Sequence, residues 1–216
     1  MNIYIKTIKD KTPIGSQKYF SNLISRKMPL EVFQQTQLNF FDAVLFFSKP
    51  MFIISSKLDS YQERIVLLEN ILDEHGNGDI SKAHGKTFEH YLLSIGVSQV
   101  RINDHISSTA SKYFNNYLLK AAEEETTHFS IAMMGIIEDR YVEITKILID
   151  AFSSNKWFKG KSLTHYNTHK KLDVNHSESF YNLIKHHWYD KTHKIEIKRG
   201  LDLGNKLILK LYSDLL

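Results

Sequence analysis

The sequence contains no cysteine, and only three prolines and nine glycines among its 216 residues. Without cysteine the chain can form no disulfide, zinc–thiolate site or iron–sulfur cluster, and it has no cysteine nucleophile. The prolines stand at positions 13, 29 and 50, so none interrupts the rest of the chain. Long stretches without proline and with few glycines favour helices. We therefore predict an all-α fold.

An excess of one charge and a long apolar run are also missing. The chain has 28 Lys+Arg against 24 Asp+Glu, a formal net charge of +4, and both signs are mixed along its length. This excludes a basic stripe of the kind that binds nucleic acid. The most apolar stretch, 38–54, is broken by polar residues before it reaches the roughly 20 residues of a membrane span. Residues 1–10 lack the apolar segment of a secretory signal. We expect a cytoplasmic protein with neither a nucleic-acid nor a membrane partner.

The chain has the composition of one globular domain, because 42% of its residues are hydrophobic and no repeat or proline-rich linker divides it. We assign residues 1–216 to a single domain. Apolar residues at helical spacing predict helices at about 29–50, 57–74, 81–95, 103–120, 126–152, 162–186 and 194–214. The glycines of 75–79 predict a turn. Antiparallel helices of these lengths pack as a compact bundle.

The sharpest chemical signal is the motif His-x3-Asp-x2-His, formed by His169, Asp173 and His176. On a helix these steps leave the three side chains within about 60° of one line, so they share a face. Leu172 and Phe180 fall near the same face, which directs the motif toward the interior. A buried carboxylate needs compensation, and carboxylate-x-x-His is a motif of carboxylate-bridged di-iron bundles. The alternative is a solvated helix face on which the aspartate balances neighbouring lysines.

A second signal is Glu138, which follows an entirely apolar run, 131–137. It shares a helical stripe with Met134 and Tyr141, so its carboxylate is expected inside the bundle. A buried glutamate is rare unless it is paired or bound to a metal. The alternative is a rotated helix that leaves Glu138 at the rim beside Arg140 or Lys146.

The third signal is the pair Glu74 and His84. Glu74 ends one predicted helix and His84 lies in the first turn of the next, so the glycine turn between them can bring both to the same end of the bundle. His75 and His90 compete with His84 for this role. The alternative is a solvated glutamate at a helix C-terminus, a position that the helix dipole slightly disfavours.

In this order and spacing the candidates resemble the haem-oxygenase-like di-iron oxidase family, which includes CADD-like proteins and iron-containing redox enzymes. Three motifs carry the resemblance: Asp-Glu-x-Gly before a histidine early in the next helix, a glutamate after a small and apolar run, and His-x3-Asp-x2-His. The family's metal ligands fall on Glu74, His84, Glu138, His169, Asp173 and His176. The similarity covers about residues 35–210.

The resemblance implies a single-domain, seven-helix bundle like haem oxygenase, with a di-iron site in place of haem. Two Fe(II) ions, or an Fe/Mn pair, would be held by the six ligands, of which the carboxylates Glu74, Glu138 and Asp173 take the catalytic role. Mixed carboxylate and imidazole ligands suit these metals. O2 would be the co-substrate, reacting through a peroxo di-ferric intermediate. The expected substrate is a small amino-acid-derived amine or carboxylate in a biosynthetic pathway. The sequence is compatible with a homodimer and does not identify the electron donor.

The ligand set and the activity each leave a rival interpretation open. Glu125-x2-His128 repeats the carboxylate-x-x-His step and offers a rival ligand set. A thiaminase-type relative is excluded, because it relies on a cysteine. Some members of the family act on fatty acids or form p-aminobenzoate, and a non-enzymatic helical binding module would need no metal.

Residues that could bind a substrate are less specific than the ligands. A substrate carboxylate could be held by Arg64, Arg101, Arg140 or Lys146, each of which could equally be a surface charge. Candidate aromatic pocket residues, which could equally be core, are Phe40, Phe41, Phe46, Phe47, Tyr141 and Tyr166.

Overall fold

The computed structural model describes residues 1–155, 157 and 164–216, without the side chains of 164 and 167–173. Within these residues 83% are helical and there are no strands, which confirms the all-α prediction. In chain order the elements are α1 (Asn2–Lys11), η1 (Ile14–Ser16), α2 (Lys18–Ile24), α3 (Leu30–Phe46), α4 (Ser48–Ser56), α5 (Tyr61–Glu74), η2 (Gly76–Gly78), η3 (Ile80–Lys82), α6 (His84–Ser94), α7 (Gln99–Asn103), α8 (Thr109–Glu124), α9 (Thr127–Asn155), α10 (Thr164–Ile184), η4 (His187–Tyr189) and α11 (Lys191–Asp214).

The prediction of seven helices is wrong. Helices α3 and α4 form one helix, Leu30–Ser56, in which Phe47 keeps helical φ and ψ angles of −58° and −33°. Counted this way, the described residues form ten helices. The additional ones are α1, α2 and α7, which are short and are stabilised by packing rather than by a long local pattern. Pro50 does not end its helix, because the residues after it stay helical as far as Ser56.

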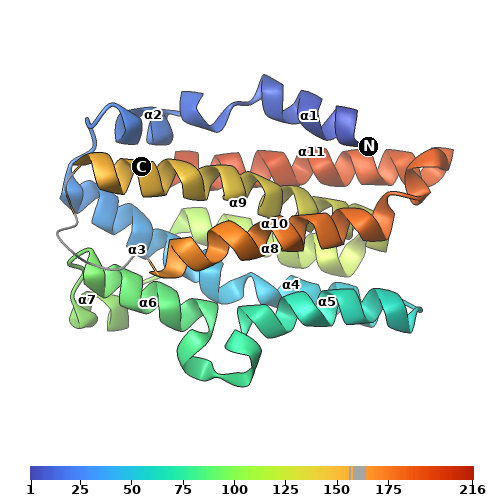
Figure 1. Ribbon diagram of the computed structural model, residues 1–216, viewed down its shortest axis with the longest axis horizontal. Coiled ribbons are helices and arrows are strands. Elements are labelled where there is room, and N and C mark those ends of the chain that lie inside the picture. The colour runs from blue at the N-terminus through green and yellow to red at the C-terminus, as the bar shows by residue number, and fades with distance from the viewer. Residues whose placement is uncertain (156, 158–163) are drawn as a thin grey trace.

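Helix α9 is the central element of the bundle (Figure 1). Every residue from 129 to 138 is buried, as expected for a helix that is covered on all sides. Helices α10 and α11 make the most extensive contacts with α9, while α8 packs against α3, α4 and α11. Helices α1 and α2 lie along the outside of the bundle (Figure 1). The candidate residues on α9 and α10 are therefore held by one of the largest helix–helix interfaces in the described structure.

The helix Leu30–Ser56 is long and apolar enough to cross a membrane, judged by length and composition alone. It is the one helix among the described residues that passes this test, and half of its most apolar window is buried inside the bundle. One such helix is weak evidence for a membrane span, because the core helix of a soluble protein passes the same test. The cytoplasmic location stays a prediction.

Close packing between α9 and α11 depends on Gly204. A Cβ at this position would lie 2.5 Å from the carbonyl oxygen of Met133 and 2.5 Å from Cγ2 of Ile136. We expect Gly204→Ala to lower the free energy of unfolding by about 1–3 kcal/mol, because the two helices must separate to admit the methyl group. Urea unfolding measures the change. Gly15→Ala is the control, since its new Cβ meets only Ile24, at 3.5 Å; an equal loss in both variants would contradict the packing argument.

Candidate metal centre

The turn between α5 and α6 brings Glu74 and His84 together. Gly76 and Asn77 adopt positive φ angles of 68° and 53°, which fold the chain back sharply. The backbone approach is so close that a Cβ on Gly76 would lie 2.6 Å from the amide nitrogen of Ala83. Glu74 Oε2 and His84 Nδ1 are 2.7 Å apart, and both side chains are buried. The predicted turn is confirmed, and Glu74 is not a solvated helix end.

Glu138 and His176 meet the pair from α9 and α10. Glu138 is 3% exposed and His176 is 2% exposed, so the hypothesis of a rim position for Glu138 is wrong. Glu138 Oε1 lies 3.7 Å from His176 Nδ1. One ligand atom each from Glu74, Glu138 and His176 lies within 4.8 Å of the others. Three helices that are distant in sequence thus converge on a buried group that could hold a metal ion.

Asp73 sets the orientation of His176. Its Oδ2 atom lies 3.0 Å from His176 Nε2, which leaves Nδ1 facing Glu138. A carboxylate on one imidazole nitrogen fixes the ring and makes the other nitrogen a better metal ligand. Burial raises the pKa of Asp73, but hydrogen bonds from His176 and Asn77 outweigh it and hold that pKa below its usual value. Nδ1 of His176 makes no hydrogen bond with any residue that the structure describes.

The carboxylates around His176 also change its proton affinity. Burial alone lowers the pKa of His176, but Glu138, together with Asp73 and Glu74, outweighs burial and raises that pKa to about 10. In the metal-free protein this imidazole is therefore protonated at neutral pH. A metal ion that binds Nδ1 has to displace a proton.

This shift predicts how the stability of the metal-free protein depends on pH. The folded-state pKa of His176, about 10, lies above the unfolded value of about 6.5. Its contribution is complete below about pH 6.5 and is lost as pH rises through the folded-state pKa. We expect the free energy of unfolding to fall over this interval by an amount on the order of a few kcal/mol. Urea unfolding at a series of pH values measures this; an equal slope in His176→Gln would contradict the assignment.

A small cavity of about 50 Å³ adjoins the converging side chains. That volume is enough for a few water-sized groups. It is mainly apolar, and no lysine or arginine is found among the described lining residues. The lining residues are Phe40, Ala43, Val44, Phe47, Glu74, His84, Phe114, Ile137, Glu138, Tyr141, His165 and Ile208.

His165 is a site residue that the sequence interpretation missed. It is 3% exposed, it lines the cavity, and its Nδ1 atom is 2.9 Å from Thr87 Oγ1. Its ring centroid is 6.2 Å from that of His84. Its spacing of one helical turn before His169 was the available signal. Asp73 belongs to the Asp-Glu-x-Gly motif directly before Glu74, but the sequence interpretation gave it no role of its own.

Two of the predicted ligands, His169 and Asp173, fall on α10, but their side chains lie outside the described residues. The structure therefore brings together Glu74, His84, Glu138 and His176 of the predicted set. The role of all six as ligands stays a prediction.

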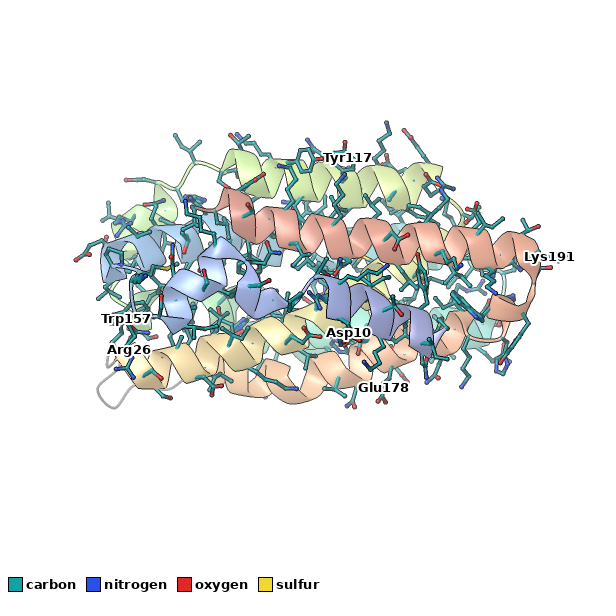
Figure 2. All side chains as sticks on the ribbon, turned by 90° about the horizontal axis from the view of Figure 1, so that it is seen from above. Asp10, Arg26, Tyr117, Trp157, Glu178 and Lys191 are labelled. Atoms are coloured by element: carbon teal, nitrogen blue, oxygen red, sulfur yellow. The ribbon has the colours of Figure 1, made fainter. Side chains whose placement is uncertain are left out.

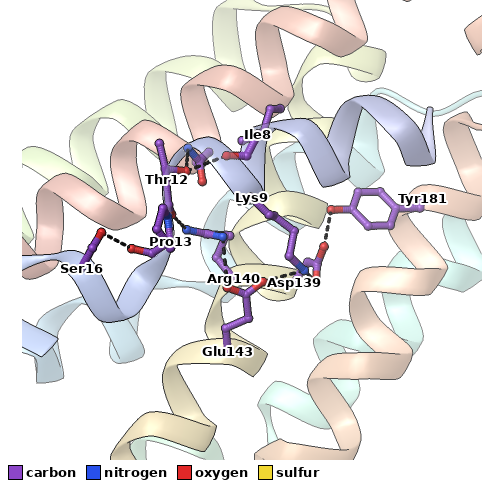
Figure 3. A network of polar contacts seen from close by, with 10 residues as sticks. Ile8, Lys9, Thr12, Pro13, Ser16, Asp139, Arg140, Glu143 and Tyr181 are labelled. Carbon is purple, nitrogen blue, oxygen red and sulfur yellow. Dashed lines mark hydrogen bonds and ion pairs between the residues drawn. The ribbon is translucent and has the colours of Figure 1, made fainter. Parts of the chain in front are cut away.

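The residues proposed as anchors for a substrate carboxylate have other partners. Arg140 is fully buried and donates to the carbonyl of Thr12 and to Glu143 (Figure 3). It is not among the described residues that line the cavity. Arg64 donates to the backbone carbonyls of Leu58 and Asp59, just after α4, and Arg101 donates to Gln35. Lys146 lines a surface groove. None of these basic side chains lines the described cavity. The structure therefore does not support the hypothesis that one of them binds a substrate carboxylate there.

The rival ligand pair Glu125 and His128 is separated from the site. Glu125 accepts a hydrogen bond from Arg199, and the His128 ring lies beside His187 and His193 rather than beside Glu138. His75, the competitor of His84, bonds the carbonyl of Ile71.

The aromatic pocket candidates divide into two groups. Phe40, Phe47 and Tyr141 line the cavity. Tyr166 instead donates to Gln37, Phe41 lines a neighbouring pocket, and the Phe46 ring lies under the ammonium group of Lys49. The first group therefore forms part of the apolar wall beside the candidate ligands.

The donor set fits iron. It offers carboxylate oxygens and imidazole nitrogens with no sulfur ligand, which is the set preferred by Fe(II) and Mn(II). Burial of Glu74 and Glu138 beside each other is costly without a cation to compensate their charge. The carboxylate of Asp73 also contacts the ring nitrogen of His176 that faces away from Glu138, an arrangement that is common for histidines that bind metals.

Residues 37–201 match the iron-containing redox enzyme family. The chain belongs to this family. The resemblance stated from the motifs is thereby confirmed, and an iron-dependent redox enzyme is the activity class that the family name carries. Comparison with curated proteins gives no significant match.

Solved structures similar to this iron-containing redox enzyme share its haem-oxygenase-like fold. One is a domain of unknown function from Shewanella denitrificans, with 13% identity, a TM-score of 0.81 and coverage of 99% of this chain and 89% of that chain. A CADD-like protein of unknown function from Nostoc punctiforme has 11% identity, a TM-score of 0.79 and coverage of 99% and 96%. A TenA homologue from Pseudomonas syringae has 12% identity, a TM-score of 0.77 and coverage of 98% and 92%. At these identities the likeness shows the fold alone.

Proposed function

We propose that this protein is a non-haem di-iron oxidoreductase that uses O2 to oxidise a small amino-acid-derived substrate. The observation that carries the proposal is the convergence of Glu74, Glu138 and His176, with ligand atoms within 4.8 Å, beside a buried apolar cavity. A redox-active metal pair at this place would supply the electrons for O2 reduction.

The chain's own residues would perform three tasks. Glu74, Glu138, His84 and His176 would hold the metal ions, together with His169 and Asp173. Asp73 would keep the His176 ring in its ligating orientation. Tyr141 and the cavity's phenylalanines would exclude bulk water from the reacting groups.

The cavity also supports a choice of substrate class. Its volume of about 50 Å³ is far below the about 300–1,000 Å³ of a pocket for a drug-sized ligand. A small substrate is therefore favoured over a long acyl chain. With no basic side chain in the described lining, the substrate's polar group would face the carboxylate and histidine side, and its carbon skeleton would contact Phe40 and Phe47.

The proposal is tested by oxygen consumption. The tag-free chain, loaded with Fe(II) without oxygen, is mixed with O2 and with panels of amino acids, amines and fatty acids. We expect small amino-acid-derived compounds to increase the rate of O2 uptake and to be consumed, which mass spectrometry follows. Iron binding with no compound-dependent O2 uptake would favour metal storage. The absence of both iron binding and O2 uptake in the folded protein would favour a helical binding module.

A further inference from the structure

Three histidines from separate elements gather at one end of the bundle. The ring centroid of His128, at the start of α9, lies 4.4 Å from that of His187 in η4 and 4.1 Å from that of His193 in α11. The centroids of His187 and His193 are 5.3 Å apart. One ring nitrogen from each lies within 4.8 Å of the other two. Modest side-chain rotation would bring all three onto one ion at the about 2.0–2.1 Å of a zinc–nitrogen bond.

This cluster is separate from the carboxylate centre. His128 and Glu138 are ten residues apart on the continuous helix α9, which corresponds to a separation of about 15 Å. Lys191, the first residue of α11, marks this end of the bundle, and Arg26 and Trp157 lie at the opposite end (Figure 2). All three histidines are partly exposed, so an ion can reach them from solvent.

The cluster is poorly explained as ordinary packing. Nδ1 of His193 is shielded from solvent, makes no hydrogen bond with a described residue, and stays 3.7 Å from Asp190. Burial, with His187 and His193, lowers the pKa of His128 to about 4. Neutral imidazole is the ligating form.

The chemistry of the donors distinguishes this cluster from the buried centre. Only imidazole nitrogens are offered, and such sites favour the late divalent ions, Zn²⁺ and Cu²⁺, over Fe²⁺ or Mn²⁺. Three histidines with an open fourth position are a known zinc arrangement. Nearby Asp190 and Glu196 would offset part of the ion's charge.

We propose that His128, His187 and His193 form a second metal site, which binds one Zn²⁺ ion and joins the start of α9 to the α10–α11 turn. The ion would connect three elements whose histidine rings lie close together at this end of the bundle.

The test compares wild type with His193→Ala, His187→Gln and His186→Ala, all tag-free and stripped of metal. His186 is the matched control, because it is an exposed neighbour of His187 outside the cluster. In calorimetric titrations with Zn²⁺, His193→Ala and His187→Gln should bind one ion fewer than wild type, or should bind that ion at least about 100-fold more weakly. The control should match wild type. Equal stoichiometry and affinity in all four proteins would overturn the proposal.

A spectroscopic measurement separates this site from the carboxylate centre. Substoichiometric Cu²⁺ should give an electron paramagnetic resonance spectrum with coupling to three imidazole nitrogens in wild type, His186→Ala and Glu138→Gln. That spectrum should be absent from the two cluster variants. His187→Gln keeps the test decisive if His193→Ala does not fold, since His187 lies in a short, partly exposed turn. A three-nitrogen spectrum that survives in folded His187→Gln, or is lost in Glu138→Gln, would contradict the assignment.

Discussion

The Glu138→Gln variant is expected to lose its bound iron and at least about 100-fold of its O2-dependent activity. The substitution keeps the shape of the side chain but removes the negative charge that lies 3.7 Å from His176 Nδ1. A neutral amide neither compensates a cation nor bridges two of them as a carboxylate does. The loss of this charge also lowers the pKa of His176, which Glu138 helps to raise to about 10. Iron analysis, O2 uptake and NMR titration of His176 measure the three effects.

Glu143→Gln is the matched control for Glu138→Gln. Glu143 lies on the same helix, but it pairs with Lys9 and Arg140 (Figure 3) and lines a different, surface groove. Iron content and O2 uptake should match wild type in this variant. If Glu138→Gln kept full iron and activity while Glu143→Gln lost them, the centre would have to be placed elsewhere.

Replacing Arg140 by alanine should cause a large loss of stability. Its side chain is fully buried, and its guanidinium donates to the carbonyl of Thr12 and, at 3.0 Å, to Glu143. Removing it leaves an empty volume and deletes charge-assisted hydrogen bonds, which together correspond to roughly 2–4 kcal/mol. Helix α1 would lose its connection to α9 through this side chain. We expect a Tm lower by about 5–15 °C and faster hydrogen exchange in α1.

Arg199→Ala serves as the control for Arg140→Ala. The Arg199 side chain is 51% exposed and pairs with Glu125 and Glu196 at the surface, so its removal should change stability by less than about 1 kcal/mol. In the Arg140→Ala variant, measured at temperatures at which that variant is folded, the iron content and the KM for the substrate should equal those of wild type. A raised KM with unchanged stability would instead indicate that Arg140 binds a substrate carboxylate.

The sequence predicted those parts of the site that follow from helical spacing. The uninterrupted apolar run before Glu138 indicated that this part of α9 is covered on all sides. Glu138 directly follows the run, so its side chain was expected to be buried as well. The glycine turn predicted that Glu74 and His84 meet. Asp73 could not be predicted, because its role depends on the relative placement of α5 and α10. The same holds for the packing of His128 against His187 and His193.

The fold was predictable in class but not in helix number. Residues 2–11 mix three isoleucines with three lysines, and such a short segment has too little apolar surface to be recognised as a helix by itself. In the structure, α1 is held by Arg140 at its C-terminal end and by the ion pair of Lys9 with Asp139. These contacts are distant in sequence, and no local pattern indicates them.

The central claim is that the carboxylate–histidine group binds iron and makes it reactive toward O2. The most direct test is anaerobic titration of the metal-free chain with Fe(II), followed by rapid mixing with O2 while visible absorption is recorded. We expect about two irons per chain, release of a proton as His176 binds, and a transient absorption that His176→Ala lacks. Failure of the folded wild-type chain to take up iron, or equal iron uptake and absorption in His176→Ala, would contradict the account.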